Sequence, residues 1–147
     1  MRILPADPDL LIVSCDGAAR GNPGPAGIGV VVARADGEVL ATIAEGLGET
    51  TNNVAEYTAA REGLRKAAEL GARRVHLRSD SQLLIEQLSG RYRVKAVHLR
   101  PLFAQVRSEI ARFEEVRLEH VPREQNREAD GLANEGVDDW LQGRHAD

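Results

Sequence analysis

The 147-residue sequence contains a single cysteine, Cys15, and only 3% of its residues are aromatic. One cysteine cannot form an intramolecular disulfide, so nothing in the sequence requires an oxidising compartment. No apolar run approaches the roughly 20 residues of a membrane-spanning helix, and Pro5, Asp7 and Pro8 interrupt the N-terminal stretch where the core of a signal peptide would lie. We therefore expect a cytoplasmic protein with no membrane partner.

An excess of basic charge is also absent. The formal net charge is −4, with 19 Lys and Arg against 23 Asp and Glu, so a polyanionic partner would have to meet a local patch. The sequence has no internal repeat, low-complexity tract or domain linker, and a chain of this length can bury an independent core. The sequence predicts one domain over residues 1–147, with its core at about 10–141, and we expect a monomer.

What the sequence does contain is a series of strand and helix patterns. Alternation of apolar and polar residues predicts strands at 10–15, 26–34, 38–46, 73–79 and 115–121. Helical spacing of apolar residues predicts helices at 53–70, 79–90, 98–113 and 126–141. The first three strands follow one another, with a hairpin-like turn at 35–37, so they predict an antiparallel meander. The whole order predicts an α/β fold in which a mixed sheet is flanked by helices.

Four acidic residues lie at junctions between these predicted elements. Asp16 ends the first strand, Glu56 lies in the first turn of the first helix, Asp80 ends the fourth strand, and Asp130 lies early in the last helix. Each has an ordinary explanation alone: a turn, a helix N-cap, or a first-turn acid favoured by the helix dipole. Strand ends and helix starts can share one rim of a sheet, where clustered carboxylates without Cys or His favour Mg²⁺ or Mn²⁺. Two such ions about 4 Å apart can align a water against a phosphodiester.

Four motifs surround these acids in order: DGAARGNPGPAG, TNNVAEYTA, SDSQL and VPREQNREAD. On these motifs the chain resembles the type 1 ribonuclease H family over roughly residues 11–133. The resemblance implies a five-stranded mixed sheet with strands one to three antiparallel. It also implies an endoribonuclease that hydrolyses the RNA strand of RNA/DNA hybrids with two Mg²⁺ or Mn²⁺ ions, leaving 5′-phosphate and 3′-hydroxyl ends. The implied metal ligands are Asp16, Glu56, Asp80 and Asp130.

The resemblance also assigns substrate contacts to polar residues of the same motifs. The residues that would touch the minor groove of the hybrid, where the 2′-hydroxyl distinguishes RNA from DNA, are Asn22, Asn52, Asn53 and Gln82. Thr51, together with Asn22, resembles a pocket for a phosphate of the DNA strand. The alternative for each residue is a turn or cap, because Asn and Thr side chains readily bond nearby backbone groups.

The chain departs from the best-known bacterial members of that family in one segment. It lacks a separate helical insertion rich in Lys and Trp between the third motif and the last predicted strand, and has RYRVKAVHLR there instead. No acid occurs from 87 to 108. We predict a phosphate-tracking patch, with a solvated surface stretch as the alternative. Its predicted contacts are Arg91, Arg93 and Lys95.

A loop before the last helix assists catalysis in that family, through a His in most members and through an Arg in some members with a VPR-type loop. The sequence HVPREQN offers both His120 and Arg123. His120 is in phase with the apolar residues Val116 and Leu118, which favours a strand-end histidine at the margin of the core. Arg123 is therefore the preferred helper, with His120 as the alternative.

Two other functions remain open at this level. One is a related two-metal nuclease that also cuts double-stranded RNA, and the other is a catalytically silent module that binds nucleic acid. The complete acid set disfavours the silent module, and the Asn and Gln residues favour a hybrid over plain DNA. A thiol nucleophile at Cys15 is disfavoured, because no His and Asn constellation accompanies it.

Overall fold

Five strands form one mixed sheet in the computed structural model, which describes residues 7–144. The strands are β1 (Leu10–Ala19), β2 (Gly24–Arg34), β3 (Val39–Thr50), β4 (Arg74–Ser79) and β5 (Glu115–His120). Their order across the sheet is β3-β2-β1-β4-β5, in which β1 to β3 are antiparallel and β4 and β5 run parallel to β1. The predicted five-stranded mixed sheet with an antiparallel meander is confirmed.

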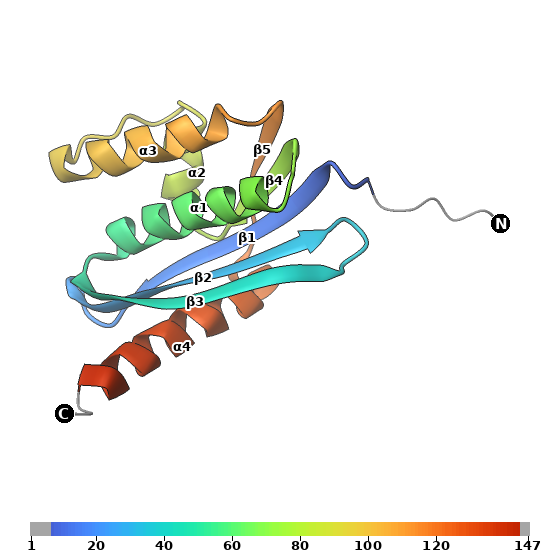
Figure 1. Ribbon diagram of the computed structural model, residues 1–147. Helices are drawn as coiled ribbons and strands as arrows, with labels where there is room; N and C mark the ends of the chain where they lie inside the picture. Colours follow the sequence, from blue (N-terminus) through green and yellow to red (C-terminus); the bar gives the residue numbers. More distant parts are fainter. Residues whose placement is uncertain (1–6, 145–147) are drawn as a thin grey trace.

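The helices cover the two faces of this sheet unequally. They are α1 (Asn52–Glu69), α2 (Gln82–Leu88), α3 (Arg100–Ile110) and α4 (Arg127–Arg144), with short 3₁₀ turns at Val97–Leu99 and Arg123–Gln125. Figure 1 shows α1, α2 and α3 on one face, and α4 alone on the other, where it packs on β1, β2 and β3. None of the helices in the described range is long and apolar enough to cross a membrane.

The core between the sheet and α1 follows from two sequence patterns. Alternate residues of β1 and β2 point toward α1 and are buried, namely Leu11, Val13, Cys15, Ile28, Val30 and Val32. The facing side of α1 carries Ala60, Gly63 and Ala67, which are also buried. A Cβ at Gly63 would lie 2.6 Å from Val13 Cγ1, so the small residues let the helix approach the sheet closely.

The structure corrects three details of the predicted boundaries around the acids. The strand β1 does not end at Asp16, because it continues to pair with β2 as far as Ala19. Its parallel pairing with β4 ends at Ser14, however, so Asp16 lies just past the point where the two strands stop pairing. Glu56 lies in the second turn of α1, because the helix begins at Asn52. The N-cap of α2 is Ser81 rather than Asp80, since Ser81 Oγ accepts a hydrogen bond from Leu84 N at 3.2 Å.

Candidate active site

Three of the four predicted acids converge at one rim of the sheet. Asp16 comes from β1, Glu56 from α1 and Asp80 from the residue after β4, and one carboxylate oxygen of each lies within 4.8 Å of the others. Close packing produces this arrangement, because Gly17 touches the α1 backbone: a Cβ there would lie 2.3 Å from the carbonyl carbon of Ala55. The three acids are therefore positioned by the sheet and by α1, which pack tightly against each other.

The fourth acid, Asp130, reaches the same cleft from the opposite face of the sheet. Its helix, α4, lies so close to β2 that a Cβ at Gly29 would lie 1.9 Å from the carbonyl oxygen of Ala129. Gly29 is the residue paired with Asp16 in the β1–β2 register. Asp130 is not within the 4.8 Å group, but it lines the same cleft as the other three acids. Because Gly29 has no side chain, α4 can approach the sheet closely beside Asp16.

Asn126 connects the start of α4 to β1 through a hydrogen bond. Its side chain is buried, and Nδ2 donates a hydrogen bond to the Cys15 carbonyl oxygen at 3.0 Å. Its own carbonyl oxygen accepts from Asp130 N at 3.0 Å. One residue therefore links the backbone beside Asp16 with the backbone of Asp130. The sequence interpretation did not single out Asn126, although an Asn at the first position of a predicted acid-bearing helix is a usable signal.

Burial and mutual repulsion raise the pKa values of the two deepest acids. Asp16 is 4% exposed, and burial, followed by the charges of Glu56 and Asp80, raises its pKa to about 10. Burial and the charge of Asp80 raise the pKa of Glu56 to about 8. Glu56 Oε2 is buried and has no hydrogen-bond partner in the described part of the chain. The protein alone thus disfavours a fully ionised cluster, and oxygen-only donors with an unpartnered oxygen fit a hard divalent cation.

The acids line a cleft with a cavity volume of about 570 Å³, which we call the acidic cleft. Its other lining residues are Gly17, Ala18, Ala19, Arg20, Asn52, Ser81, Arg123 and Asn134. Arg20 donates to Asp138 Oδ1 at 2.7 Å, which ties the turn after β1 to α4. The sequence analysis did not single out Arg20 or Asn134, since their approach to the cleft depends on the packing of α4.

Three of the predicted substrate residues accept hydrogen bonds from backbone N–H groups of the protein. Asn22 Oδ1 accepts a hydrogen bond from Asn52 N at 3.1 Å, and Asn52 Oδ1 accepts from Ala19 N at 3.0 Å. Thr51 is the N-cap of α1, since its Oγ1 accepts from Val54 N at 3.3 Å. These oxygens therefore have the turn and cap roles that were the alternative to substrate binding. The side-chain NH₂ groups of both exposed asparagines remain available to a ligand.

The remaining predicted substrate residues lie on α1, on α2 and in the loop after α2. Gln82 is exposed at the first position of α2. Asn53 lines a neighbouring groove of about 490 Å³ together with the three predicted cations, Arg91, Arg93 and Lys95. We call residues 91–96 the cationic loop.

One of the three cations is already paired within the protein. Arg91 Nε and an NH₂ nitrogen donate to the two oxygens of Glu86 at 2.6 and 2.9 Å. Glu86 lies one residue before the acid-free stretch, so counting acids along the sequence overestimated the free charge of the patch. Arg93 and Lys95 are exposed and have no ion-pair partner among residues 7–144.

The structure separates the two candidate helper residues. His120 is the last residue of β5, which is the edge strand of the sheet, and its side chain is exposed rather than at the core margin as predicted. Val116 and Leu118, which share its strand phase, pack against the core, whereas His120 is exposed. His120 does not line the acidic cleft, whereas Arg123 does.

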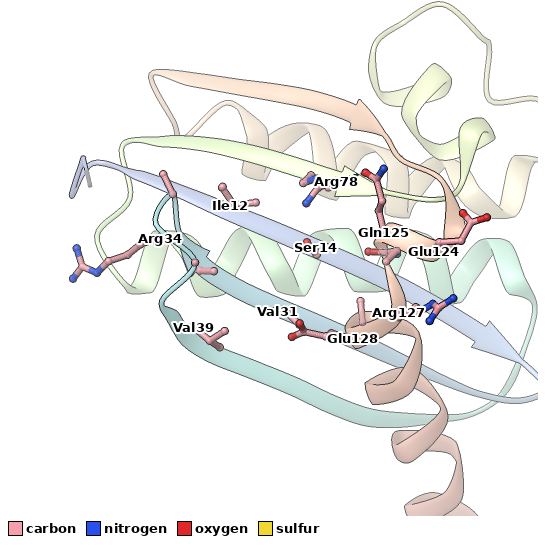
Figure 2. A pocket seen from close by; sticks show the side chains of 15 residues that line it. Ile12, Ser14, Val31, Arg34, Val39, Arg78, Glu124, Gln125, Arg127 and Glu128 are labelled. Atoms are coloured by element: carbon pink, nitrogen blue, oxygen red, sulfur yellow. Dashed lines mark hydrogen bonds between the residues drawn. The ribbon is translucent and has the colours of Figure 1, made fainter. Parts of the chain in front are cut away.

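A further hollow, of about 310 Å³, lies on the α4 side of the sheet (Figure 2). Ile12, Ser14 and Val31 line it from the sheet, and the segment from Glu124 to Ala129 lines it at the start of α4. None of the four acids lines this hollow. It is therefore distinct from the acidic cleft.

The chain matches the family described as reverse transcriptase-like over residues 14–136. It is 44% identical to the bifunctional protein Rv2228c of Mycobacterium tuberculosis over 93% of this chain and 38% of that protein. It is 43% identical to ribonuclease HI of Halobacterium salinarum over 84% of this chain and 62% of that protein. The chain thus spans less than two thirds of the length of both relatives.

Solved structures agree with these sequence matches. The RNase H1 structure from Halobacterium salinarum has a TM-score of 0.86 and 41% identity, covering 88% of this chain and 98% of that one. LC11-RNase H1, isolated from compost by a metagenomic approach, was solved in complex with an RNA/DNA hybrid. That structure has a TM-score of 0.85 and 40% identity, covering 89% of this chain and 99% of that one.

Proposed function

The chain belongs to the type 1 ribonuclease H family, and we propose that it is an endoribonuclease that hydrolyses the RNA strand of RNA/DNA hybrids. The observation that carries this proposal is the acidic cleft, where Asp16, Glu56 and Asp80 lie within 4.8 Å of one another and Asp130 faces them. The similarity to a structure solved with an RNA/DNA hybrid supports this substrate class. The products would carry 5′-phosphate and 3′-hydroxyl ends.

The four carboxylates would hold two Mg²⁺ or Mn²⁺ ions. When bound, such ions supply a means of activating water and stabilising the leaving oxygen of a phosphodiester. The protein contributes the placement of the ligands: β1 presents Asp16, α1 presents Glu56, and Asn126 holds α4 so that Asp130 meets them. Asp16, Glu56 and Asp80 would supply ligand oxygens from one side of the cleft, and Asp130 would supply a ligand from α4.

The residues around the cleft would bind and orient the nucleic acid. The amides of Asn22, Asn52, Asn53 and Gln82 would read the minor groove, where 2′-hydroxyls distinguish RNA from DNA. Thr51, with Asn22, would bind a phosphate of the DNA strand. Arg93 and Lys95 would follow the backbone beyond the cleft, with Arg91 contributing less because Glu86 already pairs with it.

Cleavage of labelled RNA/DNA hybrid, double-stranded RNA and double-stranded DNA, measured side by side, tests this proposal. We expect Mg²⁺- or Mn²⁺-dependent cleavage of the RNA strand of the hybrid, no cleavage of double-stranded DNA, and loss of activity in EDTA. Equal cleavage of double-stranded RNA would replace the proposal with a two-metal nuclease of broader specificity. Hybrid binding without cleavage under any divalent cation would indicate the silent binding module.

Substitution of Arg123 tests the role of the loop before α4. We expect Arg123→Ala to lower turnover by roughly ten- to a hundredfold, or about 1.4 to 2.7 kcal/mol of barrier, with a smaller change in hybrid affinity. Arg123 lines the acidic cleft, and because a guanidinium group is a poor proton donor, it would steer a phosphate or a water.

His120→Ala is the matched comparison for this substitution. Because His120 is exposed and does not line the cleft, we expect turnover and its pH profile to stay close to those of the wild type. If His120→Ala instead cripples turnover and removes an inflection near neutral pH, the helper role belongs to His120.

A further inference from the structure

The cationic loop has little regular structure of its own. Residues 93–96 belong to no helix, strand or turn, although Arg93 and Lys95 are two of the exposed cations beside the acidic cleft. An irregular segment carries no repeating ladder of backbone hydrogen bonds, so its position depends on individual contacts. The contacts made by residues 93–96 therefore determine where Arg93 and Lys95 lie relative to the cleft.

Gln87 of α2 makes one of those contacts from inside the protein. Its side chain is 6% exposed, and Nε2 donates a hydrogen bond to the Arg93 carbonyl oxygen at 3.4 Å. On its other side, Gln87 Oε1 accepts a short hydrogen bond from the Tyr57 hydroxyl. A buried pair, Tyr57 and Gln87, thus connects α1 to the backbone of the cationic loop.

The two hydrogen-bond partners of Gln87 fit one orientation of its side-chain amide. A side-chain amide has one accepting oxygen and one donating NH₂ group, and the two can exchange places by rotation. Because the Arg93 carbonyl oxygen can only accept, the NH₂ group faces it, and Oε1 faces the Tyr57 hydroxyl, which donates to it.

The Tyr57 ring is fixed independently of its hydroxyl. Tyr57 is 2% exposed, and its ring packs edge to face against Phe103 of α3, with the ring centroids 6.5 Å apart. Tyr57 directly follows Glu56 on α1, and α2, which carries Gln87, begins two residues after Asp80. Through Tyr57 and Gln87, the loop is therefore connected to α1, the helix that carries Glu56.

We propose that Tyr57 and Gln87 are positioning residues that hold the cationic loop at a fixed distance from the acidic cleft, so that Arg93 and Lys95 meet the backbone of the bound nucleic acid. This inference rests on the proposed function, since it concerns how the substrate is held. The pair then governs affinity for the hybrid and leaves the chemical step unchanged. A second anchor limits the effect of losing the pair, because Val94 is buried and its carbonyl oxygen accepts from Arg100 Nε at 3.4 Å.

Tyr57→Phe tests the proposal by removing one oxygen atom while keeping the ring. We expect KM for the hybrid to rise about fivefold, which is the scale of one lost buried hydrogen bond, with kcat within about twofold of wild type. The dependence of log K for hybrid binding on log salt concentration should also become shallower. In an Arg93→Ala, Lys95→Ala background, Tyr57→Phe should change KM no further.

Thr58→Val is the matched control. Thr58 is buried on the same helix, and its hydroxyl donates to the Val54 carbonyl oxygen at 2.7 Å, so the substitution removes a buried hydroxyl that does not reach the loop. We expect Thr58→Val to leave KM and the salt dependence unchanged. A rise in KM equal to that of Tyr57→Phe would overturn the proposal, because loss of stability alone would then explain both.

Hydrogen exchange provides a readout that needs no substrate. Amides in residues 93–96 should exchange faster in Tyr57→Phe than in the wild type and in Thr58→Val, while those of β1 stay unchanged. Unchanged exchange in the loop, or a fall in kcat with an unaltered KM, would overturn the proposal. If the wild-type protein neither binds nor cleaves the hybrid, the proposed function fails; the exchange data would then still decide whether the pair holds the loop.

Discussion

Asp16→Asn is expected to lower Mg²⁺-dependent cleavage of an RNA/DNA hybrid by at least about a thousandfold, or about 4 kcal/mol of barrier. Asp16 stands at the centre of the acidic cleft, with oxygens of Glu56 and Asp80 within 4.8 Å of its own. A neutral amide is a poor ligand for a hard cation, so the variant loses the metal rather than the fold. Single-turnover cleavage over a range of Mg²⁺ concentrations measures the effect.

The same substitution should stabilise the protein in the absence of metal. The pKa of Asp16 rises to about 10 and that of Glu56 to about 8, so the metal-free folded state binds protons that the unfolded chain has released. Stability of the metal-free wild type should therefore fall as the pH rises from about 4 toward 8 and above. In Asp16→Asn that fall should be smaller, because one acid and its repulsion are gone. Thermal unfolding in EDTA at several pH values tests the sign.

Asp36→Asn is the matched control for both measurements. Asp36 lies in the β2–β3 hairpin, where its Oδ1 accepts from Glu38 N at 2.9 Å, a role that asparagine keeps. Its cleavage rate and its pH-dependent stability should stay close to those of the wild type. Near-wild-type turnover of Asp16→Asn at saturating Mg²⁺ would refute the site assignment.

Gly17→Ala is expected to lower both stability and turnover, although it changes no acid. A Cβ at this position would lie 2.3 Å from the Ala55 carbonyl carbon and 2.4 Å from Glu56 N, so α1 must move away from β1. Overpacking of this kind costs about 1 to 3 kcal/mol of unfolding free energy. The shift also moves Glu56 relative to Asp16, and a displacement near 1 Å can cost about a hundredfold in rate. Urea denaturation and steady-state kinetics measure the two effects.

Gly143→Ala provides the control for this substitution. Gly143 lies in the last turn of α4, and a Cβ there would meet no atom within 4 Å. Because alanine favours the helix over glycine, we expect unchanged turnover and equal or slightly higher stability. If Gly17→Ala retains wild-type turnover, the contact between β1 and α1 does not position the cluster.

The sequence by itself determined the element order and the identity of the four acids. Alternating residues such as Leu11 and Val13, and the small stripe of Ala60, Gly63 and Ala67, report which face of each element is buried. These patterns are local, since the period of a strand or helix can be recognised within one short segment of sequence. Motif spacing then indicated which acids belong together. Hence the meander, the five-stranded sheet and the candidate ligands were all predictable.

Sequence patterns were less reliable where a residue's environment depends on a distant segment. Glu86 forms an ion pair with Arg91, although Glu86 lies just outside the acid-free stretch that contains Arg91. His120 has the phase of a core residue but is exposed, because it stands at the end of an edge strand. Both errors arose because sequence phase and charge counts do not report which side chains lie nearby in space.

Only the tertiary structure decided how the acids become a site. The end of β1–β4 pairing at Ser14 leaves Asp16 beyond the paired strands, and Asn126 joins α4 to Cys15 across more than a hundred residues of chain. The Tyr57–Gln87 pair likewise arises from two helices that no local pattern connects. Such contacts depend on how closely elements pack and which way a side chain turns. Those quantities are set by the whole fold, because a close approach depends on which residue each element presents to its partner, as where Gly29 faces Ala129 and Gly63 faces Val13.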